Sequence, residues 1–137
     1  SNTTMATVRT KQDIDHCWEV ANETYKQLFW SIDMMTFLSW GVSKKCYAFY
    51  HNMPTLILRV SGMVHKGWVY VSLDEASDSY IITLLNIRRE VKKTMSDIYC
   101  DSLGSVIDEL VEKPADMNDK VYHQKAIRDS QEKFNRV

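Results

Sequence analysis

Two helical stripes of apolar residues flank a central stretch in which apolar and polar positions alternate with a period of two. Residues 12–30 place apolar side chains at every third or fourth position, which predicts an amphipathic helix. Residues 46–87 divide into short runs rich in β-branched and aromatic residues, separated by turn-forming residues. A second helical stripe covers residues 96–113 and ends at Pro114. The order helix, strands, helix predicts an α+β fold.

The central stretch predicts about four strands, at residues 46–50, 56–60, 68–73 and 79–87. The connections between them are far shorter than the dozen or more residues that a parallel crossover needs, so we expect an antiparallel β-meander. Residues 31–43 fit either more helix or a further strand; helix is favoured, with Gly41 ending it. Both helices are expected on one face of the sheet, which gives two-layer packing.

The length of 137 residues predicts a single domain, which we place at residues 5–113. Residues 114–137 are mostly polar and predict a mobile or weakly helical tail. The predicted core takes one stripe from each helix and alternate residues from the strands. Its members are Ile14, Trp18, Ala21, Leu28, Leu56, Leu58, Val69, Val71, Leu73, Ile107 and Leu110.

Charge and cysteine content narrow the function classes. The chain has 17 basic and 18 acidic residues, and its net charge of −1 gives no overall attraction to nucleic acid or to a membrane surface. No apolar run approaches the roughly 20 residues that span a bilayer, and residues 1–12 lack the apolar segment of a secretory leader. The three cysteines are widely spaced and predict reduced thiols in a cytoplasmic protein.

No group of residues predicts catalysis or a bound cofactor. The four histidines are isolated, no zinc pattern occurs, and no glycine-rich phosphate cradle is present, so we predict no enzyme, no metal site and no cofactor. Cys100 is the one thiol candidate, because it is expected in the first turn of the second helix, where a helix dipole can activate a thiol. Burial beneath the sheet is the favoured alternative for Cys100.

The best functional candidate is a surface. Trp68 and Tyr70 alternate with Val69 and Val71, so they are expected on the sheet face away from the helices, exposed to solvent. Such a face favours a protein-binding or self-associating module, including a possible homodimer. Nucleic-acid binding is the alternative, because exposed aromatic rings stack on bases and neighbouring basic side chains hold phosphates. The candidate interaction surface comprises Trp68, Tyr70, Arg88, Arg89, Lys92 and Lys93.

The middle of the chain also resembles a family of small α+β proteins of gut Bacteroidetes, often encoded near phage or conjugative elements, with no established activity. The similarity spans residues 12–113, and Ile98-Tyr99-Cys100-Asp101-Ser102-Leu103 is its most specific part. Phe29-Trp30 departs from it, standing where the family usually has a glycine pair. The resemblance implies the element order above and an accessory role for a mobile element, and it implies no site residues. Its other matching segments are residues 38–41, 55–58 and 67–75 with the strand at Tyr80.

Overall fold

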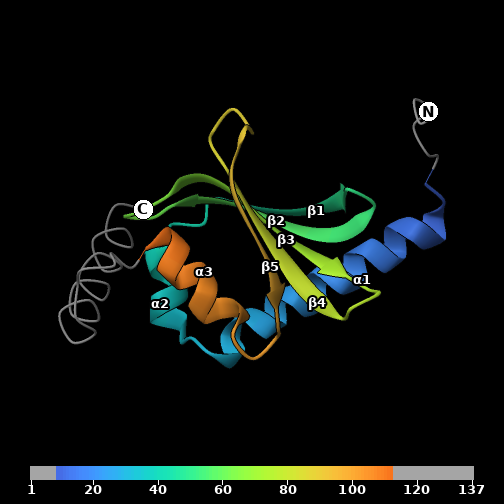
Figure 1. The fold of residues 1–137 in the computed structure, drawn as a ribbon, viewed down its shortest axis with the longest axis horizontal. Coiled ribbons are helices and arrows are strands. Elements are labelled where there is room, and N and C mark those ends of the chain that lie inside the picture. Colours follow the sequence, from blue (N-terminus) through green and yellow to red (C-terminus); the bar gives the residue numbers. More distant parts are fainter. Residues whose placement is uncertain (1–8, 113–137) are drawn as a thin grey trace.

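The computed structural model describes residues 9–112 and confirms the α+β prediction (Figure 1). In the chain, the five strands of one sheet come between an N-terminal helix and a C-terminal helix. The predicted tail at 114–137 lies outside the described residues. In chain order the elements are α1 (Lys11–Gln27), η1 (Leu28–Trp30), α2 (Met34–Ser39), β1 (Lys44–Tyr50), β2 (Met53–Ser61), β3 (Lys66–Asp74), β4 (Ser79–Leu85), β5 (Val91–Ile98) and α3 (Leu103–Val111).

The sheet is an antiparallel meander with the spatial order β1-β2-β3-β4-β5, as the short connections predicted. It has five strands where about four were expected. The β1–β2 connection is only two residues long, and both His51 (φ 49°) and Asn52 (φ 66°) adopt left-handed backbone conformations. A two-residue hairpin loop with two positive φ angles matches the right-handed twist of the strands that it joins. β1 and β5 are therefore the two edges of the sheet.

The prediction of a helix from residue 96 was wrong, because residues 91–98 form β5 and α3 begins only at Leu103. β5 gives little sequence signal because it is an edge strand that is mostly exposed. Of its residues, Met95 packs against the core and Ile98 is buried. Two register irregularities between β4 and β5 break the period of two that identifies a strand.

The start of α1 is fixed by a reciprocal pair of hydrogen bonds. Thr10 is the N-cap, and its Oγ1 accepts a hydrogen bond from the Asp13 amide at 3.1 Å. The Asp13 carboxylate in turn accepts one from the Thr10 amide at 3.0 Å. These hydrogen bonds lower the pKa of Asp13. Within residues 31–43, Met34–Ser39 form the short helix α2, as favoured over a strand; Asp33 caps it and Gly41 follows it at φ 61°.

Helices α1 and α3 pack against one face of the sheet and form the main core. Most predicted core residues are buried there, and Leu73 and Leu110 are partly buried against the same cluster. The prediction was wrong for Ile14 and Trp18, which are 46% and 51% exposed. Trp18 lies beside β1, the edge strand, where no further strand covers it. The main core contains Ala21, Leu28, Phe37, Trp40, Leu56, Leu58, Val60, Val69, Val71, Tyr80, Ile82, Leu84, Ile98, Leu103, Ile107 and Val111.

Candidate functional site

The second face of the sheet holds the aromatic residues of the candidate interaction surface. Trp68 and Tyr70 do point away from the helices, but the expectation that they are exposed was wrong: their exposed fractions are 4% and 7%. They pack with Ile57 and Leu85 in a second, smaller apolar cluster. The Tyr50 ring meets Tyr70 edge to face at 5.0 Å between centroids. Neither buried ring is available for stacking on a base.

Two guanidinium groups lie over the Trp68 ring. The Cζ atom of Arg89 is 4.3 Å from the ring centroid, and that of Arg59 is 5.2 Å from it. Both distances are within the range of a cation–π interaction. The structure thus brings Arg89 to Trp68 as the candidate surface required, and adds Arg59, which the sequence analysis did not select. The sequence did contain a signal for Arg59: it alternates with Leu58 and Val60 on β2, which places its side chain on the same sheet face as Trp68.

The indole nitrogen of Trp68 is buried and has no hydrogen-bond partner among residues 9–112. A buried donor without an acceptor costs roughly 1–3 kcal/mol. Trp40, in the main core, differs because its indole nitrogen donates to the carboxylate of Asp108 at 2.9 Å.

The basic cluster is divided rather than gathered on one surface. Arg88 and Arg89 lie in the β4–β5 connection, which Asn86 organises by accepting hydrogen bonds from the amides of Arg88 and Glu90. Lys93 pairs with Leu84, whose side chain belongs to the helix-covered core, so Lys93 lies towards that face. Lys92 is exposed on β5 beside it. Of the four, only Arg89 contacts the Trp68 ring.

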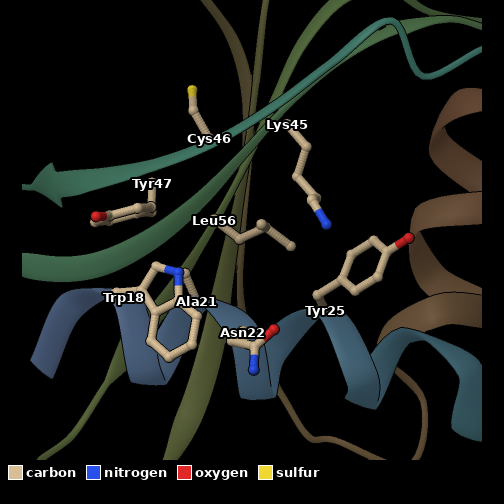
Figure 2. A pocket seen from close by; sticks show the side chains of 8 residues that line it. All are labelled: Trp18, Ala21, Asn22, Tyr25, Lys45, Cys46, Tyr47 and Leu56. Carbon is tan, nitrogen blue, oxygen red and sulfur yellow. The ribbon is translucent and has the colours of Figure 1, made fainter. Parts of the chain in front are cut away.

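A cavity that the sequence analysis missed opens between α1 and β1. It has a volume of about 300 Å³. Figure 2 shows Trp18, Asn22 and Tyr25 reaching up from α1 while Lys45 and Tyr47 reach down from β1, with Leu56 at the back. Cys46 borders the cavity by its backbone position, but its side chain points to the other side of the strand.

The chemistry of this cavity is aromatic with one cation. Trp18 and Tyr47 are 51% and 40% exposed, so their ring faces are available. The Lys45 ammonium lies 3.9 Å from the centroid of the Tyr25 ring, which holds a positive charge at one end. The sequence did carry a signal for it: Lys45 and Tyr47 share the strand face of Leu56, so an inward lysine marked an incompletely covered edge.

Thiols and histidines do not form a catalytic pair in the described part of the chain. Cys46 and Cys100 are exposed, contrary to the burial favoured for Cys100, and Cys100 lies in the turn before α3 rather than in a helix. Cys17 is buried, which raises its pKa. His16 and the Glu75 carboxylate are 2.8 Å apart at the surface. His65 is buried with Nε2 3.1 Å from the Trp68 carbonyl oxygen.

Within residues 9–112, no three His, Cys, Asp or Glu side chains are grouped so as to hold a metal ion. None of the described helices combines the length and the apolar character needed to cross a bilayer. Comparison with known proteins adds no assignment: no protein-family model matches the chain, and neither a curated protein nor a solved structure shows significant similarity to it.

Proposed function

We propose that this protein is a non-catalytic interaction module that binds an extended peptide segment of a partner protein along the outer edge of β1. The observation that carries the proposal is the open cavity between α1 and β1, which is bordered by exposed aromatic rings at an unpaired sheet edge. The proposal keeps the predicted class of protein, an interaction module, but assigns binding to this cavity instead of to Trp68 and Tyr70.

The backbone of β1 supplies the first part of the recognition. β1 pairs with β2 on one side only, so alternate residues direct unpaired N–H and C=O groups outward. A peptide that adds a strand there gains main-chain hydrogen bonds whatever its sequence. Its side chains would alternate between the two faces, so every second one would lie beside the helix layer.

The cavity supplies the second part. Peptide side chains on the helix side would meet Trp18 and Tyr47, whose exposed rings suit a large apolar or aromatic anchor. Lys45, at the end of the cavity near Tyr25, favours an acidic residue next to the anchor. The expected partner therefore presents an extended segment with one large apolar side chain and an adjacent carboxylate.

The direct test is to select peptides that bind the full-length protein from a displayed library of short unstructured peptides. Trp18→Ala and Tyr47→Ala are each expected to lower the affinity for the selected peptides roughly tenfold or more. Trp30→Ala is the matched control, because Trp30 is 71% exposed and lies outside the cavity. Slowed amide hydrogen exchange in β1 on binding would locate the added strand.

Two results would overturn this proposal. One is a set of peptides whose binding is unchanged by both cavity variants; the other is protection of amides elsewhere with none in β1. Self-association through β1 is a distinct outcome, visible in sedimentation as a dimer that selected peptides dissociate. The resemblance described above adds a setting, an accessory protein of a mobile element, and the comparisons leave that setting as a prediction.

A further inference from the structure

Positive charge converges on one indole, on the sheet face opposite the helices. Lys44 lies directly across from Arg59, and Arg59 lies directly across from Trp68, so the three form one cross-strand row. Arg89 reaches the same ring from the β4–β5 connection, 4.3 Å from its centroid. Like charges placed directly opposite on neighbouring strands destabilise a sheet, so this row favours a negative group between them.

No described residue supplies that negative group. Among residues 9–112, the one ion pair within 4.0 Å joins His16 and Glu75, at a different place in the fold. Glu90 follows Arg89 in the chain, but its carboxylate accepts a hydrogen bond from the Asn86 side chain at 2.8 Å. Arg59 and Arg89 therefore have no carboxylate partner within the described residues.

The Trp68 indole provides a second, independent indication. Its N–H group is buried and unpaired within residues 9–112, whereas buried donors in native proteins nearly always have a partner. The ring that carries this donor lies beneath the guanidinium groups of Arg59 and Arg89, and a bound oxyanion would give all three groups an acceptor.

We propose that Arg59, Arg89 and the Trp68 indole form a binding site for a small tetrahedral oxyanion of the phosphate class, with Lys44 beside it. A guanidinium group offers a planar fork of N–H donors that matches the oxygens of a phosphate. Arg89 is exposed and sits on a short connection with its backbone at φ 66°, so its side chain can turn to admit the anion to the indole. The site is independent of the α1–β1 cavity.

The distribution of charge favours one small anion over a nucleic-acid strand. Arg59 and Arg89 converge on a single ring, and Lys44 lies across from Arg59 on the neighbouring strand. Lys93 instead lies in register with Leu84 and towards the helix-covered face, so the basic residues do not form a continuous track for successive phosphates.

The indole N–H resonances of the four tryptophans give a direct readout. Trp68→Phe identifies the relevant signal, and the Trp40 signal serves as an internal control because that indole already donates to Asp108. Inorganic phosphate is expected to shift the Trp68 signal saturably, while chloride at equal ionic strength leaves it in place. Arg59→Gln and Arg89→Gln should each weaken phosphate binding roughly tenfold or more.

Arg88→Gln is the matched control, because Arg88 shares the connection with Arg89 but makes no contact with the Trp68 ring that would bind the anion. The proposal is overturned if phosphate produces no saturable shift, if chloride reproduces it, or if Arg88→Gln weakens binding as much as Arg89→Gln. A single-stranded oligonucleotide that binds when phosphate does not would also overturn it, in favour of an extended nucleic-acid surface. A phosphopeptide or nucleotide competing with phosphate at this site would support it.

Discussion

In β3, Val69 and Val71 point to the helices while Trp68 and Tyr70 point to the other side, and all four are at least nine-tenths buried. The first pair is covered by helices α1 and α3. The second pair is covered locally, by the Tyr50 ring and by the guanidinium groups of Arg59 and Arg89. A strand face without a helix over it can thus still be closed, when large rings and long basic side chains cover one another.

The two faces of the sheet differ in how permanently they are covered. A helix covers a sheet permanently, whereas an exposed arginine over a ring can move aside for a ligand. The helix-covered face is therefore expected to contribute most of the stability. The opposite face is expected to contribute less stability and to take part in ligand binding. Neighbouring residues on one strand, with one side chain on each face, offer matched tests of this difference.

The largest expected difference in stability is between alanine substitutions at Leu58 and Ile57, adjacent residues of β2 whose side chains lie on opposite faces of the sheet. Leu58→Ala should cost about 2–5 kcal/mol, because the side chain is completely buried in the main core. Ile57→Ala should cost less, because its cluster contains four buried residues and no helix among residues 9–112 covers it. Urea denaturation of both variants measures the two free energies of unfolding. Equal costs would show that the second face is as rigidly packed as the first.

A second test compares the two buried indoles. Trp40→Phe removes a hydrogen bond to the buried Asp108 carboxylate, whereas Trp68→Phe removes a donor that has no partner in residues 9–112. Because both substitutions remove similar ring area, Trp40→Phe should cost about 1–3 kcal/mol more than Trp68→Phe. The free energies of unfolding, measured in phosphate-free buffer, give the difference. Equal losses would mean that the Trp68 donor is satisfied in the free protein.

Sequence reasoning located the meander because alternation in β2 and β3 is strong, and Val69 and Val71 face the helices as predicted. It missed β5 because an edge strand need not bury alternate residues, and there only Met95 and Ile98 pack inward. The helix stripe of α1 was read correctly as a pattern. The burial of its N-terminal part was overestimated, because Trp18 lies beside the edge strand β1, where no further described strand covers it.

For the candidate surface, the alternation of apolar and polar residues predicted which sheet face Trp68 and Tyr70 lie on, but not that other side chains would cover them. Exposure depends on contacts between residues distant in the chain, such as Arg89 over Trp68, which no local pattern encodes. The same limit hid most of the α1–β1 cavity, since Trp18 and Tyr47 come from elements that meet only in the folded chain, and the inward-facing Lys45 was its one signal in the sequence.

A smaller effect is expected from His65, which immediately precedes β3 and has its ring Nε2 3.1 Å from the Trp68 carbonyl oxygen. Burial lowers the pKa of His65 below its ordinary value of 6.5. Between the two pKa values the unfolded chain binds a proton that the folded protein does not, so stability rises with pH there. The contribution of His65 to stability is complete above pH 6.5 and is lost as the pH falls towards the lowered pKa.

Denaturation at about pH 7.5 and about pH 5.5 measures this dependence. His65→Gln should reduce the loss of stability on acidification, and His51→Gln, which changes an exposed histidine in the β1–β2 turn, should leave it unchanged. An unaltered pH dependence in His65→Gln would assign the titration to another group.

The smallest effect leaves stability untouched and concerns thiol reactivity on the two sides of β1. Cys17 lies on α1 against the sheet, buried, with a raised pKa, whereas Cys46 points to the other side of β1 and is exposed. Iodoacetamide at neutral pH should therefore label Cys46 and Cys100 in the native protein and Cys17 only after unfolding, as mass spectrometry of peptides would show. Labelling of Cys17 in the native state would mean that α1 separates from the sheet. Labelling of Cys100 far ahead of Cys46, which is also exposed, would show activation of the Cys100 thiol and would revive the thiol-dependent alternative.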